Sequence, residues 1–286
     1  MKVAFVGLGV MGFPMAGHLA AAGHELAVFN RSHDKAARFG ATHAGARIGP
    51  TVAETAEGAE VLALCVGRDD DVRAVVDAAM PVLAPGAVIV DHTTTSAKLA
   101  RAMAEQAAAG GRAFVDAPVS GGQAGAEKGA LTIMLGGEVA ACETVEPVIA
   151  AYGKAIRRIG GPGSGQLAKM VNQICIAGVV QGLAEAVHFA KRADLDTDGV
   201  LAAISKGAAQ SWQMDNRWPT MVEGRFDFGF AVDWMRKDLG LVLDEARTNG
   251  AQLALTALVD QFYAEVQDMG GRRWDTSSLV ARLERS

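Results

Sequence analysis

The chain has 286 residues, a length closer to two domains than to one, and 50% of its residues are hydrophobic. Its 27 basic and 32 acidic side chains give a formal net charge of −5, and the two signs are mixed along the sequence. This balance does not predict a nucleic-acid or membrane-surface partner. The three cysteines lie far apart without a C-x-x-C pair, which argues against a zinc or redox site and favours a reduced cytoplasmic compartment.

The sequence does not predict a signal peptide or a membrane span. The apolar run at the N-terminus is short, is interrupted by glycines and lacks an A-x-A-like cleavage site. Residues 171–190 form the most apolar long stretch, but they include Asn, Gln, Glu and His side chains, too many for a lipid-embedded helix. We therefore expect a soluble protein.

Apolar strands alternate with alanine-rich helices in the first half of the chain. The pattern predicts a strand at 3–6, a helix at 11–22, a strand at 25–29, a helix at 34–39, a strand at 61–66, a helix from 70, and strands at 88–91, 113–117 and 131–135. Gly23 and Gly40 are expected to end helices, because glycine adopts positive φ at low cost. This alternation is typical of βαβ units and predicts an α/β fold with a doubly wound, mainly parallel sheet.

The strand pattern stops after the sequence GGPGSGQ at 160–166. The remainder predicts a long helix at 166–192, a helix that opens near Thr197, and helices at 231–248, 255–269 and 277–284. We therefore expect two domains, a nucleotide-binding domain at 1–162 and an all-helical domain at 163–286.

A G-x-G-x-x-G motif follows the first predicted strand and opens the first predicted helix. Its glycines are Gly7, Gly9 and Gly12. In this context the first glycine permits a tight turn, the second lets a pyrophosphate approach the backbone, and the third lets helix and strand pack closely. We predict that residues 7–12, namely Gly7, Leu8, Gly9, Val10, Met11 and Gly12, bind a dinucleotide. The alternative is a glycine-rich turn without a ligand.

The end of the second predicted strand indicates which dinucleotide is bound. A carboxylate at this place typically binds the ribose 2′-hydroxyl of NAD, whereas a nearby arginine accommodates the 2′-phosphate of NADP. This chain has Asn30 and Arg31 there. We predict that both residues contact the cofactor and that NADP(H) is preferred, with NAD(H) as the alternative if Arg31 is merely solvated and Asp34 reaches the ribose.

Three further stretches carry candidate chemistry. In DAPVSGG, the Ser120 hydroxyl and the unobstructed backbone of Gly121 and Gly122 could bind a carboxylate, although a plain turn fits the same residues. In GSGQLAKMVNQ, Lys169 and Asn172 share one helix face. A lysine that is partly desolvated there could protonate the alkoxide formed by hydride transfer to a carbonyl, while the alternative is a solvated surface lysine.

The third stretch, FAVDWMRKDLGL, carries Phe230, Lys237 and Asp238. Lys237 and Asp238 fall at the polar margin of an amphipathic helix, where they could be either functional groups or a solvated charge pair.

Together these motifs resemble those of the β-hydroxyacid dehydrogenase family, which includes 3-hydroxyisobutyrate dehydrogenase and semialdehyde reductases. The resemblance covers essentially the whole chain, through GLGVMG, DAPVSGG, GALTIMLGG, G-x-G-x-x-x-K-x-x-N and KDL. It implies a Rossmann domain followed by an all-α domain of the 6-phosphogluconate dehydrogenase C-terminal type, which a long helix opens.

The resemblance also implies roles for the candidate residues. Lys169 would be the catalytic acid/base with Asn172 beside it, and Ser120, Gly121 and Gly122 would bind the substrate carboxylate. Thr94 would lie near the nicotinamide, Lys237 would touch the cofactor, and Phe230 and Asp238 would close the pocket. The sequence DHTTTS departs from the usual D-x-S-T, so either Thr93 or Thr94 could make the contact. Trp212 would point toward the pocket or, alternatively, lie in the core.

These observations predict an NADPH-dependent reductase of small carboxylate-bearing aldehydes that runs reversibly as a 3- or 4-hydroxyacid dehydrogenase. Imine reduction is an alternative in the same fold, which the presence of Lys169 makes less favourable, and a non-catalytic binding module is a third. We expect a homodimer or homotetramer, because a helix of about 40 Å is too long for a small helical domain to cover.

Overall fold

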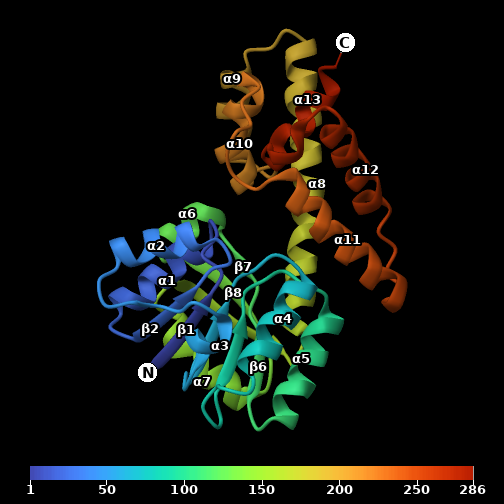
Figure 1. The fold of residues 1–286 in the computed structure, drawn as a ribbon. Helices are drawn as coiled ribbons and strands as arrows, with labels where there is room; N and C mark the ends of the chain where they lie inside the picture. Colours follow the sequence, from blue (N-terminus) through green and yellow to red (C-terminus); the bar gives the residue numbers. More distant parts are fainter. Residues whose placement is uncertain (286) are drawn as a thin grey trace. The chain divides into compact units, whose positions relative to one another are not determined.

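The computed structural model describes residues 1–285 and divides into two compact units (Figure 1). The first unit is Met1–Lys169 and the second begins at Met170. The sequence-based boundary at 162/163 lies a few residues earlier, so the first turns of the long helix α8 (Ser164–Arg192) belong to the first unit.

The first unit contains one mixed sheet. Its strands are β1 (Lys2–Val6), β2 (Glu25–Phe29), β3 (Arg47–Ile48), β4 (Val61–Leu64), β5 (Val88–Asp91), β6 (Ala113–Asp116), β7 (Val119–Ser120), β8 (Leu131–Gly136) and β9 (Gly153–Gly160). The order is β3-β2-β1-β4-β5-β6-β8-β7, and β9 pairs with β8. The path from β3 to β6 is parallel, whereas β8 runs antiparallel to β6 and β7. This order confirms the predicted Rossmann sheet.

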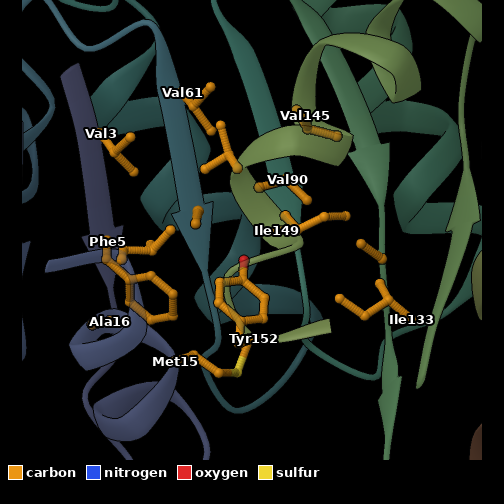
Figure 2. Close-up of a cluster of buried hydrophobic side chains, with 14 of the residues drawn as sticks. Val3, Phe5, Met15, Ala16, Val61, Val90, Ile133, Val145, Ile149 and Tyr152 are labelled. Atoms are coloured by element: carbon orange, nitrogen blue, oxygen red, sulfur yellow. The ribbon is translucent and has the colours of Figure 1, made fainter. Parts of the chain in front are cut away.

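Seven helices of the first unit cover both faces of the sheet. They are α1 (Gly12–Ala21), α2 (His33–Thr42), α3 (Val52–Ala56), α4 (Asp69–Ala79), α5 (Ala97–Ala109), α6 (Gly122–Glu127) and α7 (Val139–Ile149). Val3 and Phe5 of β1 face one core with α1, α2, α6 and α7, whereas Ala4 and Val6 face the other with α3, α4 and α5. The alternation follows from the two-residue period of a strand. Figure 2 shows the first of these cores, with Phe5, Met15 and Tyr152 close together.

One predicted helix end is wrong. Gly23 has φ +81 and follows α1, as expected. Gly40, in contrast, lies inside α2, which continues to Thr42. A Cβ atom at Gly40 would lie 3.3 Å from the side chain of Ile48 in β3, so this glycine permits close packing of helix and strand rather than a helix cap.

The second unit is helical, as predicted. Beyond α8 it contains α9 (Thr197–Ile204), α10 (Trp212–Glu223), α11 (Val232–Asn249), α12 (Ala254–Asp268) and α13 (Leu279–Leu283), with two short 3-10 turns before α13. The core contains Trp218, Met235 and Tyr263, all fully buried. The sequence did not predict α10, although the Ser211 hydroxyl caps it by accepting the Met214 N–H at 3.0 Å.

Helix α8 is long and apolar enough, by length and composition alone, to cross a membrane. The core helix of a soluble protein has the same properties, so this finding is weak evidence for a span. The absence of a membrane partner stays a prediction.

Candidate active site

The glycine loop between β1 and α1 has the geometry of a dinucleotide cradle. Gly7 has φ +101, and a Cβ atom there would overlap the carbonyl oxygen of Cys65. A Cβ atom at Gly12 would overlap the carbonyl oxygen of Gly7. Gly9 differs, because no atom lies within 4 Å of the place its Cβ would take. Gly7 and Gly12 therefore permit the tight turn, and Gly9 leaves open backbone that a pyrophosphate can approach.

The other predicted residues of this loop differ in exposure. Leu8 is buried in the core, Met11 is half-buried at the N-cap of α1, and the side chain of Val10 is exposed. The backbone of the loop, rather than its side chains, is therefore the part suited to bind a pyrophosphate. The Leu8 side chain packs in the core and holds the loop in place.

Asn30 ties the glycine loop to the end of β2. Its Oδ1 accepts the backbone N–H of Leu8 at 2.8 Å, and its Nδ2 donates to the carbonyl oxygen of Ser32 at 3.0 Å. Asn30 thereby holds the loop in place, a role that the sequence did not suggest for it.

Arg31 follows Asn30 with a side chain that is 92% exposed. Its guanidinium lies 3.7 Å from the carboxylate of Asp71 in the first turn of α4. The exposed guanidinium can reach a phosphate at this strand end, and Asp71 is a competing anion for it.

The segment after β5 is ordered by its own polar groups. Asp91 accepts the N–H of Thr93 at 2.8 Å, and the Thr93 hydroxyl accepts the N–H of Val66 at 3.0 Å. Thr93 is buried, whereas Thr94 is half-buried. The Thr93 hydroxyl is therefore engaged by the backbone after β4, and a cofactor contact by either threonine stays a prediction.

His92 links this segment to the loop after β6. Its Nδ1 lies 2.8 Å from the carbonyl oxygen of Ala117, and its Nε2 lies 2.8 Å from the hydroxyl of Tyr152. Burial lowers the pKa of His92 to about 4. A neutral imidazole must carry its proton on Nδ1 to donate to Ala117, so Nε2 accepts the Tyr152 hydroxyl.

The loop after β6 exposes the predicted carboxylate-binding residues. Gly121 and Gly122 have φ of +127 and +60, and both are exposed. No atom lies within 4 Å of a Cβ position at Gly122, and Ser120 is half-buried in β7, opposite Thr132. Two consecutive exposed glycines with positive φ leave their backbone N–H groups accessible to an anion.

Lys169 is 8% exposed, so it is not a solvated surface lysine. It is the last residue of the first unit and lies in the second turn of α8. Asn172 follows three residues later on the same helix, a spacing that places the two on one face.

Three polar contacts connect the predicted residues of the second unit. Asn172 Nδ2 donates to Gln173 Oε1 at 2.8 Å, and Gln173 Nε2 donates to Asp238 Oδ2 at 2.6 Å. Lys237 Nζ lies 3.1 Å from Asp238 Oδ1. Asp238 is 1% exposed, so the solvated-pair interpretation is wrong. Gln173, also buried, was not among the predicted site residues; its signal was an amide within an apolar helix.

Phe230 and Trp212 are both partly exposed. The N–H of Phe230 donates to Asp275 at 3.0 Å, which anchors the start of α11, and the residue is 39% exposed. Trp212 is 55% exposed with the Arg217 guanidinium 5.0 Å from its ring, so the core interpretation of Trp212 is wrong. Trp218 occupies the core instead.

In the first unit, the candidate residues therefore follow the carboxyl ends of β1, β2, β5 and β6, which is the edge where ligands bind to parallel sheets. Among the residues that the structure describes, no three His, Cys, Asp or Glu side chains lie close enough together to bind a metal ion.

Comparison with known proteins agrees with this geometry. A family model for the NAD-binding domain of 6-phosphogluconate dehydrogenase matches residues 2–161, and a model for the NAD-binding of NADP-dependent 3-hydroxyisobutyrate dehydrogenase matches residues 163–283. The chain belongs to the β-hydroxyacid dehydrogenase family. It is thus an NAD(P)-dependent hydroxyacid dehydrogenase, and its first unit is a nicotinamide dinucleotide-binding domain.

Relatives in the family match over the full length. An uncharacterized oxidoreductase of Shewanella frigidimarina is 59% identical over 288 residues, covering 100% of this chain and 99% of the relative. The 2-hydroxy-3-oxopropionate reductase of Escherichia coli is 34% identical, covering 99% and 97%. A solved structure of Mycobacterium tuberculosis 3-hydroxyisobutyrate dehydrogenase with L-serine has a TM-score of 0.91 at 28% identity, covering 99% of both chains.

Proposed function

We propose that the protein uses NADPH to reduce small aldehydes that carry a carboxylate, and that it oxidises the corresponding 3- or 4-hydroxyacids in reverse, with Lys169 as general acid/base. The observation that carries the proposal is the burial of Lys169, which is 8% exposed in the second turn of α8. A lysine held this far from water is suited to proton transfer rather than to solubility.

When bound, the nicotinamide supplies or accepts the hydride. In the reducing direction, the Lys169 ammonium donates a proton to the carbonyl oxygen as that oxygen gains negative charge. In the oxidising direction, the neutral amine removes the proton from the substrate hydroxyl. The Ser120 hydroxyl and the backbone at Gly121 and Gly122 hold the carboxylate, which orients the carbonyl carbon.

Asn172 would contact the substrate, and Asp238 would help to enclose it. Gln173 joins their side chains, so this polar row is held in one arrangement. Thr94 would contact the nicotinamide, Lys237 would contact the cofactor, and Phe230 would exclude water. The Ser120 hydroxyl and the backbone N–H groups at Gly121 and Gly122 are the donors that would recognise an anionic group, so an aldehyde that bears a carboxylate is the proposed substrate class.

The preference for NADPH rests on Arg31. Its exposed guanidinium follows β2, where the ribose of a bound dinucleotide would lie, and no carboxylate replaces Asn30 at the strand end. The NADP-dependent dehydrogenase described by the second family model supports the same preference.

We extend the proposal to assembly and compartment. Val171, Val179 and Phe189 of α8 are exposed, and a second copy of the chain would cover them in a homodimer or homotetramer. The well-separated cysteines favour the cytoplasm.

Turnover assays test the proposal. NADPH and NADH oxidation is measured with succinic semialdehyde, glyoxylate, methylmalonate semialdehyde and tartronate semialdehyde, using the wild-type protein, Lys169→Ala, and Lys191→Ala as a matched control on the same helix. We expect NADPH-dependent turnover with at least one acid, which is lost in Lys169→Ala and kept in Lys191→Ala. Binding of NADPH without turnover on any carbonyl acid would contradict the proposal and favour imine reduction or a binding module.

A further inference from the structure

The helix that carries Lys169 is capped by a carboxylate from another element. Gly163 precedes α8 with φ +88 and has no side chain with which to cap it. Asp116, at the end of β6, takes this role: its Oδ1 accepts the N–H of Gly163 at 2.7 Å, and its Oδ2 accepts the N–H of Gln166 at 2.9 Å. A Cβ atom at Gly165 would lie 2.8 Å from the same carboxylate. The first turn of α8 is therefore fixed to the sheet.

Gln166 adds a second connection, to the segment that carries Thr94. Its side chain is fully buried. Nε2 donates to the carbonyl oxygen of Thr93 at 2.7 Å, and Oε1 accepts the N–H of Thr95 at 3.0 Å. These two backbone groups flank Thr94. One side chain thus holds the peptide groups on both sides of the proposed nicotinamide contact.

The same residue also precedes Lys169 by three positions on α8. Side chains at this spacing lie on one face of a helix. Gln166 therefore couples the placement of the Thr94 segment to the helical turn from which Lys169 emerges, and every contact in this connection lies within the first unit.

We infer that Gln166 is a positioning residue for hydride and proton transfer. It sets the placement of Thr94 relative to the turn that carries Lys169, through its hydrogen bonds to Thr93 and Thr95. The inference rests on the proposed roles of Lys169 and Thr94. Because the Asp116 carboxylate already caps the helix, the Gln166 side chain is not needed to start α8. Its two buried hydrogen bonds orient the Thr93–Thr95 segment instead. A displacement of about 1 Å in a reacting arrangement can cost on the order of 100-fold in rate.

Two substitutions separate orientation from general stability. Gln166→Met keeps the length of the side chain and loses both hydrogen bonds. Gln166→Glu keeps the shape: a neutral carboxylic acid can donate to the Thr93 carbonyl and accept from the Thr95 N–H, whereas the ionised form has no proton to donate. Gln106→Glu is the matched control, because Gln106 is half-buried on α5 and its amide donates to Asp77 in an exposed hydrogen bond away from the Thr94 segment.

We expect Gln166→Met to lower kcat by about 10- to 100-fold at every pH, with KM for the acid substrate and the NADPH Kd changed less than about threefold. Gln166→Glu should show the same loss at high pH and recover toward wild-type kcat as the pH falls. The primary isotope effect with deuterated NADPH should rise in both variants, because the transfer step becomes slower. Gln106→Glu should match the wild type.

Other titrating groups surround this position, so each rate is divided by the wild-type rate at the same pH. They are Asp91 at the end of β5, His92 next to it, Asp69 on α4, Asp116 at the end of β6, Arg101 on α5, and Lys169 itself. All are unchanged in the variants, and circular dichroism with NADPH binding confirms that each variant is folded.

The inference is overturned if both variants keep wild-type kcat, if only KM or Kd changes, or if Gln166→Glu loses activity without recovering at low pH. These outcomes are distinct from failure of the proposed function. If Lys169→Ala keeps full turnover, the proposed function fails; if Lys169→Ala is inactive and the Gln166 variants behave as wild type, only the role of Gln166 fails.

Discussion

Gln173 donates its amide N–H to the carboxylate of Asp238 at 2.6 Å, and both side chains are buried. This bond joins α8 to α11 within the second unit, and the oxygen of the same amide accepts from Asn172. A residue outside the predicted set therefore connects two residues inside it. Removal of the Gln173 amide would leave the buried Asp238 carboxylate without one of its hydrogen-bond donors.

We predict that Gln173→Leu lowers the free energy of unfolding by about 1–3 kcal/mol, because the Asp238 carboxylate loses a buried donor. The same variant should lower kcat, since Asp238 and Asn172 are no longer held together. Urea denaturation and steady-state kinetics measure both effects. Asp244→Ala is the control, because Asp244 pairs with Arg247 on the exposed side of α11 and should change stability by less than about 0.5 kcal/mol. Equal stability of Gln173→Leu and the wild type would contradict the expected role.

Burial of Asp91 makes stability depend on pH. Burial raises the pKa of Asp91 from 3.8 to about 7, against the opposing hydrogen bonds from Thr93. A carboxyl whose folded-state pKa is raised binds its proton more tightly in the native state. Its favourable contribution is therefore complete below about pH 4 and is lost as the pH rises through about 7.

The isosteric variant Asp91→Asn removes this dependence. Its free energy of unfolding relative to the wild type should rise between pH 4 and pH 7, by about 1–4 kcal/mol in total. Asp116, whose pKa is also raised by burial, to about 6, is present in both proteins, so its own titration cancels and only its charge interaction with Asp91 differs. Thermal or urea unfolding across this range measures the difference. A difference that stays constant with pH would show that Asp91 does not titrate in this window.

Two glycines of the cradle, Gly9 and Gly12, should respond differently to substitution by alanine. Gly9→Ala meets no neighbouring atom, so the fold should keep its stability within about 0.5 kcal/mol, while the NADPH Kd rises at least about 10-fold because the methyl group blocks the pyrophosphate. Gly12→Ala overlaps the Gly7 carbonyl and should destabilise the protein by more than about 2 kcal/mol. Calorimetry and NADPH titration separate the two effects. Unchanged NADPH affinity in Gly9→Ala would exclude the loop as the pyrophosphate site.

Arg31 should determine cofactor choice. Arg31→Ala removes a cation from the proposed 2′-phosphate site, so we expect the NADPH Kd to rise about 10- to 100-fold and the NADH Kd to stay within about twofold. Asp71→Asn removes the competing carboxylate and should tighten NADPH binding several-fold. Arg73→Ala, on the exposed part of α4, controls for the loss of a positive charge. An equal loss of affinity for both cofactors in Arg31→Ala would show that Arg31 does not distinguish them.

The local patterns of the sequence predicted the Rossmann sheet, the helices α1, α2 and α4, and all helices of the second unit except α10, because strong periodicity and glycine spacing act within a few residues. They did not predict α3, α5, α6 and α7. The same patterns did not predict β3 and β7, which are two residues long, or β9, whose residues are mostly exposed. The prediction that Gly40 ends a helix was wrong, because this glycine lies inside α2 and permits close packing against Ile48.

The candidate residues at the strand ends could be predicted because their positions follow from the strands. The connections between them could not, because they join residues far apart in the chain: Asp116 to Gly163, Gln166 to Thr93, and Gln173 to Asp238. Likewise, sequence alone left open whether Lys169 is buried and whether Trp212 is exposed, since both depend on tertiary packing.

The central claim is proton transfer by Lys169, and the most direct measurement is single-turnover reduction with NADPH already bound, comparing the wild type, Lys169→Ala and Lys191→Ala. General acid catalysis contributes about 100- to 10,000-fold. We predict that Lys169→Ala transfers hydride at least about 100-fold more slowly while its NADPH Kd stays within about threefold, and that Lys191→Ala equals the wild type. A folded Lys169→Ala that reduces the aldehyde within a few-fold of the wild-type rate would contradict the account.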